Sequence, residues 1–209
     1  MSALAPAWDD LMRRHGIAGA AADAVLAELV AAYAEPHRHY HTLDHIAALL
    51  RLLDEHGAGA TGRDAIRLAI LFHDAIYDPA RQDNEAASAA MAQRRLSDLG
   101  FPQPVIVKVE RLILATRHGI ETPAGDADLD LLVDLDLAVL AAPEAEYRAY
   151  ADAIRREYAI YPDAVYRPGR RRVLESFLAR DRIYRSERLR ALWEASARAN
   201  LAREIAELS

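Results

Sequence analysis

The sequence predicts an all-α protein, and three observations support this fold class. Apolar residues recur three and four positions apart along most of the chain, as they do on one face of a helix. No stretch alternates apolar and polar residues as a half-buried strand does, and no Asn-Gly pair marks a hairpin. Hydrophobic residues make up 52% of the 209 residues, enough for a sizeable core. We therefore predict a single compact helical domain over residues 1–209, with about ten helices.

The first two predicted helices are defined by their composition and their ends. An Ala/Leu-rich amphipathic stretch covers residues 21–33, and a Pro that follows soon after ends it. The second helix is predicted over residues 42–56. Thr42 is a suitable N-cap, and Asp44 suits the first turn because the helix dipole favours negative charge there.

The remaining helices follow from the same periodicity and from Gly and Pro breaks. The segment 63–76 is apolar on nearly every side, which indicates a buried helix. The later helices are predicted over residues 84–99, 103–117, 128–141, 144–160, 169–180 and 184–206. The sequence motifs described below lie within a core of about residues 30–185, and residues 184–206 form a C-terminal helical extension.

The composition excludes several classes of site and partner. With no cysteine, the chain has neither disulfides nor thiolate metal sites, so His, carboxylate and water would hold any metal. The net charge of −6 disfavours binding of a nucleic-acid polymer. No apolar run reaches about 18 residues, and no signal peptide is visible. We expect a cytoplasmic protein with no membrane partner, and the oligomeric state stays open.

Four ionisable residues are predicted to face the core, because apolar residues lie three or four positions away on the same helix face. They are His45, His73, Asp74 and Asp136. Burying an unpaired carboxylate is costly unless a cation neutralises it. A divalent ion held by two imidazoles and two carboxylates would do so, and the sequence therefore predicts a metal site.

Two further residues are alternative ligands. Asp134 lies two positions before Asp136, but its helix face is more mixed in polarity. His41 precedes the predicted N-cap, so it could reach the site or lie in a loop. The facial argument favours Asp136 over Asp134 and His45 over His41.

The ordered motifs resemble the HD-domain superfamily of metal-dependent phosphohydrolases. Its signature is a His, an adjacent His-Asp pair and a distant Asp, each on a different helix. The finer resemblance is to a bacterial subgroup of predicted phosphohydrolases. The strings that carry it are RHYHTLDHI (38–46), FHDAIY (72–77), DNEAASA (83–89), ATRHG (115–119) and DLDLAVL (134–140).

The resemblance implies His45, His73, Asp74 and Asp136 as ligands of one divalent ion. Two imidazoles favour a transition metal (Mn, Fe, Co, Ni or Zn), although Mg remains an option. Some relatives bind a second metal through additional histidines, but here only His41 and His118 would be available. We therefore expect one ion.

Further site residues are predicted from their positions near these motifs. Asp74 acts through the metal, and Glu85 and His118 are candidates for the base or proton shuttle. Glu85 could equally be a first-turn residue that suits the helix dipole, and His118 could interact with the dipole at a helix C-terminus. The candidates for substrate binding are Arg38, Tyr77, Arg117 and Arg170. Arg170 lies just after Gly169, where a helix N-terminus could meet an anion.

The resulting functional hypothesis is hydrolysis of a phosphate ester by a metal-activated water. The substrate would be a small phosphomonoester, nucleotide or phosphodiester. Two alternatives remain open: a non-catalytic module that binds or senses a nucleotide, and a di-iron oxygenase of the HD type, which would need additional His ligands.

Overall fold

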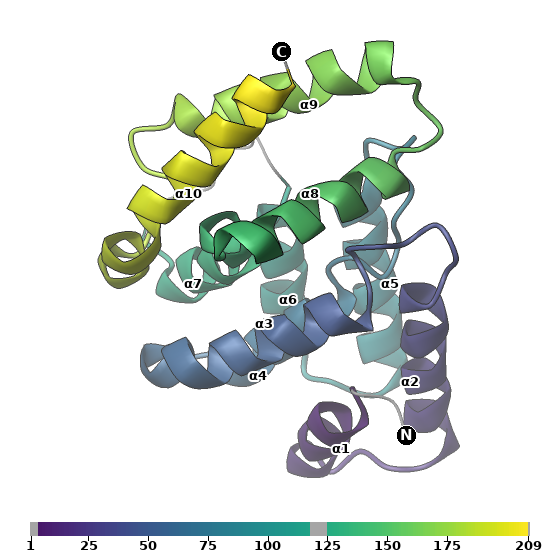
Figure 1. Cartoon of the computed structure of the whole chain (residues 1–209). Helices are drawn as coiled ribbons and strands as arrows, with labels where there is room; N and C mark the ends of the chain where they lie inside the picture. Colours follow the sequence, from purple (N-terminus) through teal and green to yellow (C-terminus); the bar gives the residue numbers. More distant parts are fainter. Residues whose placement is uncertain (1–3, 118–124, 209) are drawn as a thin grey trace. The chain divides into compact units, whose positions relative to one another are not determined.

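The computed structural model describes residues 4–117 and 125–208, and every regular element within these ranges is a helix, as predicted (Figure 1). The ten α-helices of the described residues are α1 (Ala5–Arg14), α2 (Ala20–Tyr33), α3 (Leu43–His56), α4 (Arg63–Phe72), α5 (Asn84–Asp98), α6 (Gln103–Ala115), α7 (Ala127–Asp136), α8 (Glu144–Glu157), α9 (Asp163–Leu178) and α10 (Glu187–Glu207). Two short 3-10 helices accompany them, η1 (Gly57–Gly59) and η2 (Leu137–Ala141). None of the described helices is long and apolar enough to cross a membrane.

The chain divides into two compact units, Met1–Leu132 and Val133–Ser209. In the first unit α6 packs against both α4 and α5, and α3 packs against α4. The side chains of Ile66, Ile70 and Phe72 on α4 are fully buried, as its all-round apolar pattern predicts. Burying each of these side chains stabilises the fold by about 1.5–3 kcal/mol, so α4 is a firm base for the residues at its end.

The start of α7 is anchored within the first unit by the carboxylate of Asp128. This carboxylate accepts hydrogen bonds from the backbone N–H groups of Thr61 (2.9 Å) and Gly62 (2.8 Å), and it pairs with Lys108. Burial raises the pKa of Asp128, but the hydrogen bonds from Lys108 and Thr61 outweigh this effect and lower the pKa overall. The charged carboxylate thus joins the start of α7 to the start of α4.

The structure corrects several predicted helix boundaries, among them the following. The helix predicted over residues 63–76 ends at Phe72, and residues 73–77 form a turn. The helix predicted from residue 169 begins instead at Asp163, directly after a proline, and Gly169 lies inside it. The predicted start of α3 is confirmed, although Thr42 caps it by position and its side chain makes no cap hydrogen bond.

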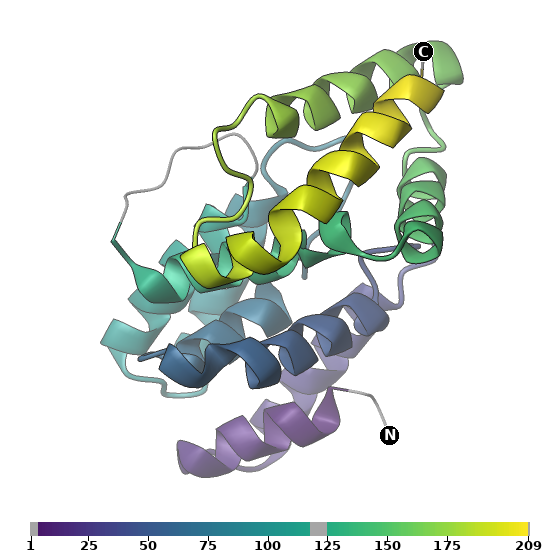
Figure 2. The ribbon, with the colours of Figure 1, turned by 60° about the vertical axis from the view of Figure 1, so that its left-hand side comes forward.

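In the second unit η2 packs against α8 and α10, and α9 lies beside α10 (Figure 2). On α10 the side chains of Ala197 and Leu201 are fully buried. The carboxamide of Asn200 donates to the backbone carbonyls of Leu140 and Ala142, each at 2.9 Å. These bonds satisfy carbonyls at the end of η2 that have no partner within the helix.

Candidate metal centre

Two histidine side chains of the first unit converge on each other. His45 lies in the first turn of α3 and His73 directly follows α4, and both are buried. Their Nε2 atoms are 3.3 Å apart. The Nδ1–H of His73 donates to the carbonyl of Ile70 at 3.0 Å, which leaves the lone pair of the neutral ring on Nε2. A backbone carbonyl bound to the far nitrogen is the usual arrangement for a histidine that ligates metal.

The carboxylate of Asp74 joins this pair. Its Oδ2 atom lies 2.9 Å from Nε2 of His73 and 3.8 Å from Nε2 of His45. Ligand atoms about 2.1 Å from a shared ion are separated by roughly 3.0 Å in octahedral and 3.4 Å in tetrahedral geometry. The His45–His73 and His73–Asp74 separations lie close to these values, whereas the 3.8 Å between Asp74 and His45 is longer than both. The role of Asp74 as a ligand stays a prediction.

The turn that carries His73 and Asp74 is held in place by Arg38. The side chain of Arg38 is fully buried, and its guanidinium donates to the backbone carbonyls of Asp74 (2.6 Å) and Ala75 (3.1 Å) and to the carboxylate of Glu35. The donors of Arg38 are used inside the protein, and its predicted role in substrate binding stays a prediction. Its hydrogen bonds explain why α4 ends early, since they take up carbonyl groups beyond the helix.

The DNEAASA motif fixes the same turn from the other side. On α5 the hydroxyl of Ser88 accepts from the N–H of Ile76 (3.0 Å) and donates to its carbonyl (3.2 Å). The side chain of Asn84 bonds both the N–H (3.1 Å) and the carbonyl (2.9 Å) of Asp78. Asn84 and Ser88 are four residues apart, so they lie on one face of the helix. The sequence analysis did not identify this role of Ser88.

The two aspartates of the DLDLAVL motif differ in their surroundings. Asp134 is fully buried, and its carboxylate accepts from the backbone N–H groups of Arg185 (2.7 Å) and Ser186 (2.8 Å). Asp134 is therefore the more deeply buried of the two aspartates, although its helix face is the more mixed in polarity. Asp136 ends α7 and is half-buried. The role of Asp136 as a metal ligand stays a prediction.

The aromatic residues around the histidine pair are packed together. The ring of His41 stacks on Tyr77 with a centroid distance of 4.2 Å and lies 5.9 Å from the ring of His45. The guanidinium of Arg38 lies 5.4 Å from the centroid of Tyr77. The roles of Tyr77 in substrate binding and of His41 as a ligand stay predictions, but both side chains line the surroundings of His45.

The other predicted site residues fall in different places. Glu85 is in the first turn of α5 and is half-buried, whereas Arg117 is exposed just after α6. The pKa of Asp83 is lowered, chiefly by its hydrogen bonds with Arg81 and in smaller part by the charge of Arg117. Arg117 thus lies near the start of α5. The candidate base His118 lies outside the described residues.

Arg170 does not mark an anion site. It lies inside α9, and its guanidinium forms a buried ion pair with Glu204, with Nε–Oε1 and Nη2–Oε2 distances of 2.7 and 3.1 Å. The hydroxyl of Tyr147 donates to the same carboxylate. The carboxylate of Glu204 on α10 is bound to Nε and Nη2 of Arg170, and the role of Arg170 as a substrate ligand stays a prediction.

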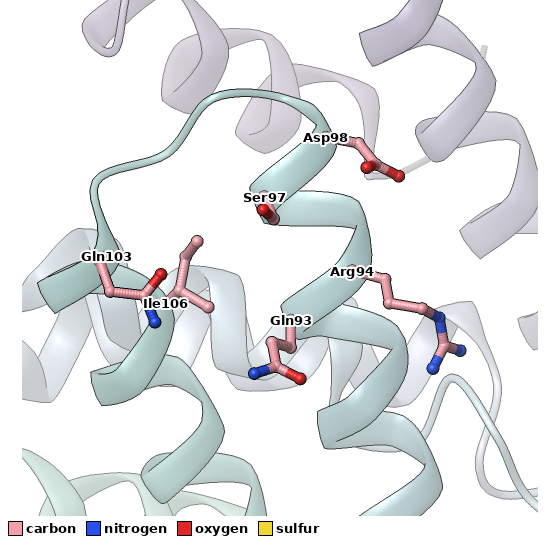
Figure 3. A pocket seen from close by; sticks show the side chains of 6 residues that line it. All are labelled: Gln93, Arg94, Ser97, Asp98, Gln103 and Ile106. Atoms are coloured by element: carbon pink, nitrogen blue, oxygen red, sulfur yellow. The ribbon is translucent and has the colours of Figure 1, made fainter.

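A surface depression of about 300 Å³ lies elsewhere in the first unit, between the end of α5 and the start of α6 (Figure 3). Its lining consists of Gln93, Arg94, Ser97, Asp98, Gln103 and Ile106. None of these residues was predicted to take part in the site.

Comparison with known proteins identifies no relative: no family model matches the chain, and no curated protein or solved structure is significantly similar to it.

Proposed function

We propose that the protein is a metal-dependent phosphohydrolase of the HD type. The observation that carries this proposal is the convergence of the imidazole nitrogens of His45 and His73 with a carboxylate oxygen of Asp74 at ligand-to-ligand distances. The three side chains come from α3 and from the turn after α4, and this turn is held by hydrogen bonds from Arg38 and Ser88. Such bracing holds the ligands in place before the metal binds.

The donor set suits a divalent transition metal. Two imidazoles, with oxygen from Asp74 and Asp136, make a mixed nitrogen and oxygen site, and the chain has no thiolate. We assign Asp136 rather than Asp134 as the second carboxylate, because the carboxylate of Asp134 is committed to the start of α10. A divalent ion bound here would lower the pKa of a bound water and polarise a phosphoryl oxygen.

The residues of the chain have separate roles in this proposal. The bond from His73 to a backbone carbonyl selects the tautomer of the neutral imidazole that has its lone pair on Nε2. Arg117 remains the candidate for the substrate phosphate, because it is exposed, whereas Arg38 and Arg170 are used internally. Tyr77 could pack against the rest of a phosphomonoester, nucleotide or phosphodiester. Glu85 stays a candidate for proton transfer.

The first test is the metal content of the purified protein and of single variants. We expect about one ion per chain in the wild type and none in His73→Ala or Asp74→Ala. The matched control is His15→Ala, which removes a half-buried imidazole from the same unit but not from the cluster. A His73→Ala protein that is folded and retains full metal content would refute the site.

The second test separates an enzyme from a binding module. The metal-loaded protein is assayed with p-nitrophenyl phosphate, bis(p-nitrophenyl) phosphate and a panel of nucleotides. Hydrolysis that disappears in His73→Ala and persists in His15→Ala supports the phosphohydrolase. Nucleotide binding without turnover would instead favour the non-catalytic module, and two irons per chain would favour an oxygenase.

A further inference from the structure

The donors of the proposed metal site in the first unit lie on two parts of the chain that are far apart in sequence. His45 is in the first turn of α3, whereas His73 and Asp74 are in the turn after α4. A functional site needs its groups held within about 0.5 Å of their working positions. Whatever fixes the start of α3 against this turn therefore fixes the spacing of the donors.

Arg38 makes this connection with one guanidinium group. Its Nη1 atom donates to the carbonyl of His41 (3.4 Å), just before α3, and to the carbonyl of Asp74 (2.6 Å). Its Nη2 atom donates to the carbonyl of Ala75 (3.1 Å). The side chain of Arg38 is fully buried, and hydrogen bonds in such surroundings are electrostatically stronger than in water. One planar group thus joins the segment before α3 to the turn after α4.

The orientation of this guanidinium is fixed by its other neighbours. Its central carbon lies over the rings of Tyr33 and Tyr77, 5.3 and 5.4 Å from their centroids. Its Nε atom donates to the carboxylate of Glu35 at 3.0 Å, which neutralises the buried charge. A cation that is stacked on rings and paired with a carboxylate keeps one plane, so its donors start from fixed positions.

His37 also contacts the turn, but in a different environment. Its Nε2 atom lies 3.0 Å from the carbonyl of Tyr77, and its side chain is exposed. Water can replace a hydrogen bond at such a position at little cost. The buried contacts of Arg38 are therefore the stronger connection between the two parts of the chain.

Arg155 makes the same kind of contacts in the second unit. Its guanidinium donates to the carbonyls of Tyr158 (3.0 Å) and Tyr161 (3.2 Å) and to the carboxylate of Asp163. It also lies over the ring of Tyr166, 4.6 Å from the centroid. The segment that Arg155 braces carries none of the proposed metal donors, so this arginine offers a matched comparison.

We propose that Arg38 is a positioning residue of the metal site, which sets the spacing of His45 relative to His73 and Asp74 and thereby the affinity for the ion. This role rests on the metal site proposed above. Replacing a residue that orients metal ligands typically weakens metal binding by about 10–100-fold. Lysine does not substitute for Arg38, because its single nitrogen lacks the planar fork that serves several carbonyls at once.

The test is titration of the full-length protein with Co²⁺ in competition with a chelator, because the visible absorption bands of bound Co²⁺ report the geometry of its ligands. For Arg38→Lys we expect an affinity about 10–100-fold weaker than that of the wild type, with altered bands. Arg38→Gln, which keeps a donor without burying a charge, should show the same direction of change. Arg155→Lys should bind Co²⁺ within about twofold of the wild type.

A second control separates positioning from general stability. Leu96 is fully buried in the same unit as Arg38, twelve residues and thus roughly 18 Å along α5 from Asn84. Leu96→Ala leaves a cavity in the core and should lower the melting temperature. If Arg38 acts by position, the folded Leu96→Ala protein should keep the Co²⁺ affinity and the absorption bands of the wild type.

The outcomes distinguish this role from the metal site itself. Wild-type affinity and bands in both Arg38 variants, with the ion lost in His73→Ala, would overturn the positioning role and leave the metal site intact. Equal weakening in Leu96→Ala and in the Arg38 variants would show a general effect of stability and overturn the role as well. Failure of both Arg38 variants to fold would do the same. A wild type that binds no Co²⁺ would refute the metal site and, with it, this role.

Discussion

The bond between Ser88 and the turn after α4 can be tested with one substitution, Ser88→Ala. Ser88 is fully buried, and its hydroxyl is bonded to both the N–H and the carbonyl of Ile76. Alanine removes the partner but leaves the two backbone groups in place. An unsatisfied buried polar group costs about 1–3 kcal/mol. Alanine also favours a helix by roughly 0.5 kcal/mol relative to serine, so we expect a net loss of about 1–2 kcal/mol.

Two assays measure this loss. Urea or thermal unfolding of the metal-free protein should show Ser88→Ala less stable than the wild type, with a melting temperature lower by roughly 2–8 °C. Hydrogen exchange at the amide of Ile76 should accelerate by about tenfold or more, because 1.4 kcal/mol corresponds to a factor of ten in the opening equilibrium. Metal affinity should fall as well, since the same turn carries His73 and Asp74.

The control is the same substitution at Ser176, whose hydroxyl bonds a carbonyl three residues earlier on the exposed face of α9. Ser176→Ala should change the stability by no more than about 0.5 kcal/mol. If Ser88→Ala unfolds like Ser176→Ala and the exchange of Ile76 is unchanged, the turn is not braced by this hydroxyl.

Three further predictions address the buried charges. Asp128 has a lowered pKa, so its stabilising contribution is complete above about pH 4 and is lost as the pH falls through the lowered pKa. The unfolding free energy, measured at a series of acidic pH values, should therefore change with pH more steeply in the wild type than in Asp128→Asn. Arg170→Met leaves Glu204 buried without its partner and should cost about 3–5 kcal/mol by urea unfolding, whereas Met in place of both residues should recover most of this loss. Asp134→Ala should lower the unfolding free energy and retain the metal, whereas Asp136→Ala should lose the metal. Loss of the metal in Asp134→Ala and its retention in Asp136→Ala would make Asp134 the ligand.

Much of the helical fold could be predicted because its signals are local. A buried helix shows apolar residues on every side, and α4 does so over residues 68–72, which are all fully buried. The start of α3 follows from Thr42 and from the acidic residue in the first turn. His45, His73 and Asp74 were predicted together because each shares a helix face with apolar neighbours, and the structure places all three side by side.

Two of the predicted substrate ligands, Arg38 and Arg170, have partners far away in the sequence. Arg38 looks like a phosphate ligand beside a histidine motif, yet its guanidinium binds carbonyls 36 and 37 residues further on. The glycine before Arg170 suggests that a helix begins there, yet the guanidinium of Arg170 pairs with Glu204, which lies 34 residues further along the chain. No pattern within a single helix indicates such partners.

By itself, the sequence determined which segments become helices and which chemical groups are available: histidines and carboxylates for a metal, arginines for anions, and no thiolate. Helix periodicity and residue type are properties of a short stretch of chain, so they can be read without coordinates. Only the tertiary structure decided where α4 stops and which charges are already neutralised. Those outcomes depend on which side chains from distant parts of the sequence pair with a buried backbone or charged group. Leaving such a group unpaired costs free energy, so the folded structure contains the pairing.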